Sequence, residues 1–167
     1  MKTHTRRQKL DYMAIIEQGV FIYKDEALCW LDGTPVEIAR SNRDPYSYSS
    51  VTILGASYKV AELVWTYFNG SVPVGFVLDH RSRIRSDNRI GNLRLATYQQ
   101  NAWNKAIKGS HSKGVRKYSK NSWFAEIVVC GCKTRLGLFK TEVEAAEAYR
   151  QASLKAHGEF SIFKEVL

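Results

Sequence analysis

The sequence predicts an α+β fold in two small parts, and three observations support that prediction. With 167 residues, 44% of them hydrophobic and 12% aromatic, the chain has enough apolar material for compact cores. The last third shows three strand-like segments followed by one helical segment, whereas the earlier residues mix short strands and helices. Between these parts lies "KGSHSKG", which is small, polar and basic, as linkers often are. We therefore place a first domain at 1–107, a linker at 108–113 and a second domain at 114–167.

The first domain is predicted to begin with short elements. A basic N-terminal arm opens the chain, with the cationic residues Lys2, Arg6, Arg7 and Lys9. A short helix and then strands around "VFIYKDEALCWL" are expected over residues 11–31, and the Ser-, Asn-, Asp- and Pro-rich residues 37–50 predict a loop. The segment "VTILGASYKV" then predicts a hairpin with Gly55 near its turn.

A helix, a strand and a second helix are expected to complete this domain. "AELVWTYFNG" places apolar residues on one helical face, and Asn69-Gly70 would end that helix. "FVLDH" (76–80) predicts a strand, and the arginine-rich residues after it are expected to form a loop. Thr97 is expected to cap a helix over residues 98–107.

The second domain is predicted to have the order strand, strand, strand, helix. The strands are expected in "GVRKYS", "SWFAEIVVC" and "KTRLGLFK", with Asn121 and Gly131 near the turns. Thr141 and Glu144 have the spacing of a capping box, and Gly158 is a natural end for the helix that follows. One apolar stripe of this helix is expected to face the sheet and contains Ala145, Tyr149, Ala152 and Ala156.

The charge balance favours a polyanionic partner. The chain has 25 Lys and Arg against 16 Asp and Glu, a net charge of +9. No apolar stretch approaches the ~20 residues of a membrane-spanning helix, and the basic N-terminus lacks the apolar core of a secretion signal. The three cysteines fit neither a disulfide framework nor a zinc ribbon. We therefore expect a cytoplasmic protein without membrane association.

One stretch, "FVLDHRSRIRSDNRIGNLRLATYQQNAWN", carries the residues that suggest chemistry. The Asp79 carboxylate and the Asn101 side-chain carbonyl are hard oxygen ligands, suited to Mg²⁺ and also to Mn²⁺. His80 can act as a general base, because the ordinary pKa of histidine is near 6.5. The neighbouring guanidinium groups would meet phosphate, and they belong to Arg81, Arg83 and Arg85. An ordinary solvated basic loop is the alternative interpretation of this stretch.

This string resembles the HNH endonucleases, in particular the form found in phage and intron homing enzymes. The matching residues are Asp79-His80, Asp87-Asn88-Arg89, Asn92-Leu93-Arg94 and Gln100-Asn101-Ala102-Trp103-Asn104. The resemblance implies a ββα-metal (HNH) fold with His80 as the base and a divalent metal on Asp79 and Asn101. It implies that Asn92 pins the loop and helps to fix the imidazole, while Asn88 caps a turn. The chain departs from the family in having "RSRI" where an Asp-Gly turn is usual after the histidine.

Residues 112–163 resemble the Apetala-two/ethylene-response-factor DNA-binding domain. The shared motifs are Gly-Val-Arg, Trp-x-Ala-Glu-Ile, Leu-Gly-x-Phe, Thr-x-x-Glu-Ala-Ala-x-Ala-Tyr and His-Gly-Glu. The resemblance implies a three-stranded sheet that enters the major groove, with contact positions at Lys113, Arg116, Lys133 and Arg135. Lysine cannot copy the bidentate arginine–guanine contact, so these residues favour phosphate contact over strict reading of bases.

Together these features predict a metal-dependent DNA endonuclease of homing type, in which His80 activates water and the C-terminal sheet holds double-stranded DNA. It would act as a monomer or as a dimer induced by DNA, in the bacterial host cytoplasm if it is phage-encoded. No Gly-rich nucleotide loop occurs, so no small-molecule cofactor is expected. The alternative is a non-catalytic DNA-binding regulator, and a third class is an RNA-binding or structural basic protein. A pure binder has no use for a general base, which favours the nuclease.

Overall fold

The computed structural model describes residues 11–36, 48–105 and 112–164. The predicted basic arm and most of the loop predicted at 37–50 lie outside the described residues, as do residues 108–111 of the predicted linker. The mixed α+β class is confirmed, with small antiparallel sheets and few helices among the described residues. None of the described helices is long and apolar enough to cross a membrane.

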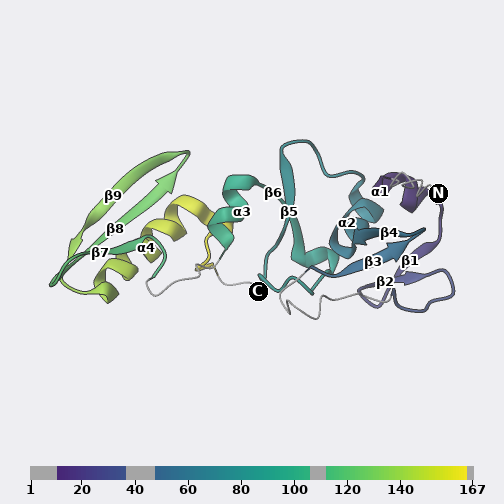
Figure 1. Cartoon of the computed structure of the whole chain (residues 1–167), viewed down its shortest axis with the longest axis horizontal. Coiled ribbons are helices and arrows are strands. Elements are labelled where there is room, and N and C mark those ends of the chain that lie inside the picture. Colours follow the sequence, from purple (N-terminus) through teal and green to yellow (C-terminus); the bar gives the residue numbers. More distant parts are fainter. Residues whose placement is uncertain (1–10, 37–47, 106–111, 165–167) are drawn as a thin grey trace, which may run out of the picture. The chain divides into compact units, whose positions relative to one another are not determined.

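Contacts between residues group the chain into two compact units, 1–97 and 98–167. The described part of the first unit has two helices, one 3₁₀ turn and three antiparallel hairpins (Figure 1). Its elements are α1 (Tyr12–Glu17), β1 (Phe21–Lys24), β2 (Ala27–Trp30), β3 (Ser50–Ile53), β4 (Ala56–Lys59), α2 (Val60–Asn69), β5 (Phe76–His80), η1 (Ile90–Asn92) and β6 (Leu93–Thr97).

Turn chemistry sets the first two hairpins. Asp25 and Glu26 connect β1 to β2, and Leu54 and Gly55 connect β3 to β4, all with positive φ. Two residues with positive φ make the turn whose twist matches that of a hairpin, so Gly55 lies where the sequence predicts. Helices α1 and α2 pack together, and Ile15, Leu63 and Val64 are among the most buried residues of this core.

The third hairpin joins β5 to β6 and carries the Asp79-His80 pair. In its register Asp79 faces Arg94, and His80 faces Leu93. The sequence predicts β5 correctly but assigns the residues of β6 to a loop. Burial does not alternate along β6, because Leu93 and Arg94 are both buried. A buried arginine is not expected from sequence alone; here the Asp79 carboxylate compensates its charge.

The second unit has the predicted order of three strands and a helix, preceded by a short helix. Its elements are α3 (Tyr98–Asn104), β7 (Val115–Ser119), β8 (Ser122–Val129), β9 (Cys132–Phe139), α4 (Glu142–His157) and η2 (Gly158–Phe160). The sheet order is β7-β8-β9, and α4 packs on one face of this sheet (Figure 1). The capping box is confirmed, because the Thr141 hydroxyl accepts from the Glu144 amide and the Glu144 carboxylate accepts from the Thr141 amide.

Two predictions for this unit need correction. Helix α3 ends at Asn104 rather than at residue 107. On α4 the buried stripe turns away from Ala156, which is exposed, and continues through Ser153 and His157. The two polar side chains are buried because they satisfy each other's hydrogen bonds, which apolar periodicity does not reveal.

Candidate functional site

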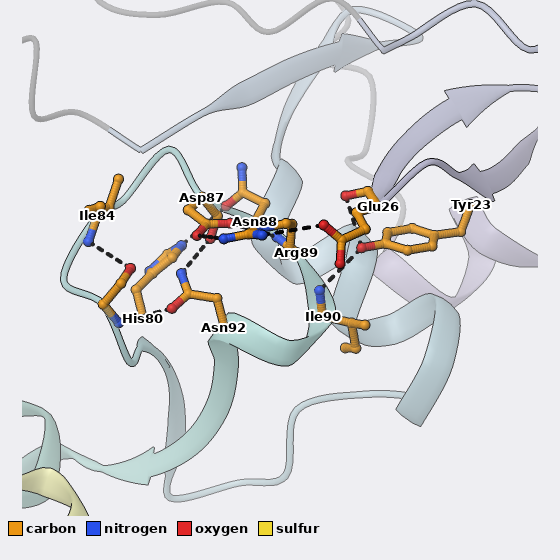
Figure 2. Close-up of polar contacts among 10 residues, drawn as sticks. Tyr23, Glu26, His80, Ile84, Asp87, Asn88, Arg89, Ile90 and Asn92 are labelled. Atoms are coloured by element: carbon orange, nitrogen blue, oxygen red, sulfur yellow. Dashed lines mark hydrogen bonds and ion pairs between the residues drawn. The ribbon is translucent and has the colours of Figure 1, made fainter. Parts of the chain in front are cut away.

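His80 is the last residue of β5, and its side chain is only 5% exposed. The imidazole Nε2 lies 3.1 Å from the Asn88 Oδ1 (Figure 2). A carbonyl oxygen can only accept, so Nε2 carries the proton and Nδ1 carries the basic lone pair. Burial lowers the pKa of His80 below its ordinary value, and the Asn88 hydrogen bond opposes this only in part. At neutral pH the ring is therefore an uncharged base.

Asn92 bonds both the first half and the second half of the loop that follows His80. Its Oδ1 accepts from the Ser82 amide at 2.9 Å, and its Nδ2 donates to the Asp87 carbonyl at 2.7 Å. Its own carbonyl accepts from the Arg81 amide at 2.9 Å. The side chain thus closes the loop, as the family resemblance implies for this position. The side chain that holds the imidazole is Asn88, to which the sequence assigns only a turn cap.

The second half of this loop is bonded to the β1–β2 turn. Arg89 binds the Asp87 carboxylate through two nitrogen atoms, each at 2.8 Å, and reaches Glu26 at 3.3 Å. The Tyr23 hydroxyl donates to the Glu26 carbonyl at 2.9 Å and accepts from the Ile90 amide at 3.2 Å (Figure 2). The arginine contact keeps the pKa of Asp87 below its ordinary value. These bonds hold the Asn88 amide next to the histidine.

The first half of this loop contains the residues predicted to contact phosphate. Arg83 is exposed, and Arg81 and Arg85 are partly exposed. Arg83 has a φ of 65°, in the left-handed region that favours glycine, and its amide donates to the His80 carbonyl at 2.9 Å. The backbone therefore turns here as a glycine would allow, although the residue is an arginine. Such strain is concentrated at functional sites.

Tyr48 borders the histidine and has no counterpart among the predicted site residues. Its ring centroid lies 5.9 Å from that of His80, and the Arg85 guanidinium lies 5.0 Å from the Tyr48 ring. Because Tyr48 is far from His80 in the sequence, within a segment predicted only as a loop, no spacing indicates this contact. The ring covers part of the site with a surface that attracts cations.

Asp79 forms a buried ion pair with Arg94. The guanidinium Nε and Nη2 lie 2.9 Å and 2.8 Å from the Asp79 Oδ2, and both side chains are 6% exposed. Both of these bonds end on the same carboxylate oxygen, Oδ2, and they fix the orientation of the carboxylate. A carboxylate oriented in this way fits the role of a monodentate ligand for a hard divalent cation.

The other predicted ligand, Asn101, is partly buried on α3 in the second unit. In the described part of the chain, no three His, Cys, Asp or Glu side chains lie close enough together to hold a metal ion. The predicted ligands are a carboxylate on Asp79 in the first unit and an amide on Asn101 in the second unit, and their binding to one metal ion stays a prediction. That donor set has the oxygen chemistry that Mg²⁺ and Mn²⁺ accept.

Three of the four contact residues predicted in the second unit lie on the sheet face opposite α4. Arg116, Lys133 and Arg135 are exposed, and the Arg116 and Arg135 guanidinium groups lie 5.5 Å and 4.8 Å from the Phe124 ring. Arg116 also forms an ion pair with Glu126. The fourth residue, Lys113, directs its ammonium group to backbone carbonyls of residues 102–105. All three of its protons are used in these contacts, and DNA contact by Lys113 stays a prediction.

Comparisons with known proteins support a nuclease assignment for the segment that contains His80. Residues 58–103 match the HNH endonuclease family. An uncharacterized HNH endonuclease of Acanthamoeba polyphaga mimivirus is 38% identical over 92 residues, which are 55% of this chain and 49% of that protein. Protein 3.8 of Escherichia phage T7 is 27% identical over 105 residues, which are 60% of this chain and 86% of that protein.

The chain therefore spans about half the length of its mimivirus relative. No solved structure matches it. The matched family segment begins in β4 and includes the whole His80 loop, β6 and most of α3. Residues 58–103 of this chain are thus similar in sequence to the HNH endonuclease family.

Proposed function

We propose that the chain is a metal-dependent DNA endonuclease of homing type that hydrolyses phosphodiester bonds. The observation that carries this proposal is the buried, uncharged His80 imidazole, held by Asn88 in a loop that Asn92 closes. This arrangement lies inside the segment that matches the HNH endonucleases. An oriented imidazole that is uncharged at neutral pH can act as a general base toward water.

In the proposed reaction, His80 Nδ1 accepts a proton from the attacking water. Asn88 fixes the tautomer that leaves the lone pair on Nδ1, and the closed loop fixes the orientation of the ring. The carboxylates of Asp79 and Asp87 favour the imidazolium that forms, because both raise the pKa of His80. The base therefore becomes better stabilised as it takes up the proton.

Asp79 and Asn101 are the residues that would hold a divalent metal, with Mg²⁺ as the first candidate and Mn²⁺ as the second. When bound, the metal supplies positive charge for the scissile phosphate and the leaving 3′ oxygen. Arg94 keeps the Asp79 carboxylate in one orientation through two bonds to a single oxygen. A fixed ligand reduces the reorganisation that metal binding requires.

DNA would be held at two places. Arg81, Arg83 and Arg85 would contact phosphates beside the cut, and Arg116, Lys133 and Arg135 would contact the target through the sheet. The sheet and α4 have the order of elements that the Apetala-two resemblance implies. Phe124 lies beneath two guanidinium groups and restricts their motion, which reduces the entropy lost when they bind phosphate.

A second candidate is a DNA-binding regulator without catalysis. The observation that favours it is the buried Asp79–Arg94 pair, which gives the predicted metal ligand a structural role as well. Such a protein would bind DNA with the same dependence on salt. Eight phosphate contacts on duplex DNA would give a log–log slope of about −7.

The experiment that separates the two is incubation of supercoiled plasmid with the purified chain in Mg²⁺, in Mn²⁺ and in EDTA. The proposed function predicts nicking or linearisation with either metal and none with EDTA. Nicking is the expected product of a monomer, and linearisation that rises steeply with protein concentration indicates a dimer formed on DNA. Salt-sensitive binding without cutting, on a plasmid library that contains the target site, would favour the regulator.

A further inference from the structure

Helix α3 is too short to be stable by itself. It has seven residues, and isolated helices shorter than ~12 residues are marginal in water. Its one buried side chain is the polar Asn104, and Tyr98 at its start is 73% exposed. No apolar stripe on α3 therefore accounts for its stability, and the contacts at its end contribute two anchors.

The first anchor is a stack between Trp103 and His157. The two ring centroids are 4.1 Å apart and the planes differ by only 9°. His157 is itself fixed at both nitrogens, with Nε2 donating to the Val128 carbonyl at 3.1 Å and Nδ1 accepting from the Ser153 hydroxyl at 3.1 Å. Ser153 in turn bonds Ser161 at 2.8 Å. The imidazole is therefore a rigid platform that belongs to α4 and the sheet.

The second anchor is the Lys113 ammonium group at the C-terminal end of α3. It donates to the carbonyls of Ala102, Trp103 and Lys105 at 2.9, 2.7 and 2.7 Å. The last carbonyls of a helix lack partners inside the helix, and a cation there also balances the helix dipole. Burial lowers the pKa of Lys113 to about 8. The ammonium group is thus hydrogen-bonded to these three carbonyls instead of to water.

The backbone beside Lys113 is held against the sheet. Gly114 has a φ of 71°, and a Cβ at this position would lie 2.1 Å from the Tyr149 ring. Its carbonyl accepts from the Glu126 amide at 2.9 Å, and the Ser112 amide donates to the Glu142 carboxylate at 3.2 Å. Residues 112–114 are therefore a fixed part of the second unit, although the sequence predicts 112 and 113 as linker.

We propose that the second unit holds α3 in its working position, and that Trp103, His157 and Lys113 are positioning residues for DNA cleavage. This inference rests on the proposed function, because the position of α3 affects cleavage only if Asn101 on α3 is a metal ligand. The sheet that would hold DNA and the helix that would supply a metal ligand then belong to one body. The second unit is accordingly part of the cleaving machinery and not a separable DNA anchor.

The test uses full-length variants with matched controls. Trp103→Ala removes the stack, Trp103→Phe keeps an aromatic ring on His157, and Lys113→Met removes the ammonium group. Lys155→Met makes the same change on an exposed lysine of α4. For each protein, hydrogen exchange of the amides of residues 98–104, affinity for DNA and the single-turnover rate of plasmid cleavage are measured at several Mg²⁺ concentrations.

Trp103→Ala and Lys113→Met should exchange faster in α3, cut about tenfold to a hundredfold more slowly on saturating DNA, and need more Mg²⁺ for half-maximal rate. Their affinity for DNA should stay at the wild-type value, and Trp103→Phe and Lys155→Met should behave as wild type. Should Trp103→Ala unfold at the assay temperature, Lys113→Met decides the question. Unchanged exchange and cleavage in the variants would overturn this inference alone. A wild-type chain that fails to cut would overturn the proposed function, and this role with it.

Discussion

The two units each contain a buried histidine, and the two histidines differ in what surrounds them. His80 and His157 are each 5% exposed, and burial lowers the pKa of both below the ordinary value. His80 ends a strand beside a basic loop, and its ring is held by the side-chain amide of that loop. His157 lies between a helix and a sheet, with both nitrogens bonded and a tryptophan stacked on its face.

The comparison shows that burial and a lowered pKa do not by themselves identify a catalytic histidine. Both properties follow from removing the ring from water, whatever the purpose. The neighbouring groups make the difference. A loop of arginines beside His80 can bring a phosphate to the ring, whereas the groups around His157 are serine hydroxyls, a carbonyl, an indole and one ammonium group, that of Lys113. We therefore propose a chemical role for His80 and a positioning role for His157.

The largest expected effect concerns the buried Asp79–Arg94 ion pair next to His80 in the sequence. We compare it with the neutral hydrogen bonds that Ser153 makes beside His157. Arg94→Met should destabilise the first unit by about 3–5 kcal/mol, because it leaves the Asp79 carboxylate buried without its partner. Ser153→Ala, which removes two neutral hydrogen bonds, to His157 and to Ser161, should cost the second unit only about 1–3 kcal/mol. Urea unfolding followed separately for each unit measures both values. Equal losses would mean that the Asp79–Arg94 pair is not the buried ion pair described here.

The second prediction concerns backbone strain in the second unit. Gly114→Ala should destabilise that unit by about 3 kcal/mol, because the new Cβ meets Tyr149 and the residue keeps a positive φ. The matched control is Gly131→Ala, which has a φ of 78° and no heavy atom within 4 Å of the added Cβ. The control should lose only about 1 kcal/mol. Thermal unfolding of both variants measures the difference, and similar losses would exclude the close packing of Gly114 against Tyr149.

The third prediction concerns the partner of the His80 imidazole. Asn88→Ala should reduce the cleavage rate about tenfold, because the ring loses the bond that fixes its tautomer. Ser86→Ala, at an exposed position of the same loop, is the control. Single-turnover cleavage at saturating DNA measures the effect. A wild-type rate for Asn88→Ala would show that Asn88 does not orient the base.

The fourth prediction tests the strained arginine of the basic loop. Arg83→Gly should stabilise the first unit by about 1 kcal/mol, because glycine adopts the positive φ without cost. The same variant should bind DNA more weakly and reduce the salt slope by about 1, since one phosphate contact is lost. Denaturation and binding at several salt concentrations measure the two effects. Lower stability combined with an unchanged slope would contradict both roles of Arg83.

The smallest expected effect is the pH dependence of the second unit. Folding lowers the pKa of His157, so the folded unit favours the neutral ring, and protonation favours unfolding. The stability from this site is therefore complete above pH ~6.5 and is lost progressively as the pH falls through the lowered pKa. The nearby Lys113 ammonium group acts in the same direction. His157→Gln should flatten the dependence of the unfolding temperature on pH in this range, and a curve of unchanged shape would contradict the prediction.

Much of the fold follows from local sequence signals. The capping box at Thr141, the turn at Gly55 and the strand that ends in Asp79-His80 all depend on residues close together in the chain. Their physical causes are local as well, namely backbone conformation and bonds between near neighbours. The order of three strands and a helix in the second unit follows for the same reason.

The features that the sequence does not predict depend on distant contacts. Strand β6 is not predicted, because a buried arginine is not expected from sequence. Only the pairing of Arg94 with Asp79 makes that burial favourable. The Asn88 contact exists because the loop folds back on His80. Lys113 has a long side chain whose partner, the end of α3, cannot be inferred from spacing. Family resemblance supplies Asn92 as a loop residue, but not the asparagine that touches the imidazole.

The central claim is that His80, rather than any other feature of this basic chain, performs the chemistry. The most direct measurement is the cleavage rate of His80→Ala beside the wild type on supercoiled plasmid in Mg²⁺, with affinity for DNA measured on the same preparations. We predict a rate at least about a hundredfold lower, the contribution expected of a general base, with unchanged affinity. A variant that cuts at the wild-type rate would contradict the assignment of His80 as the base.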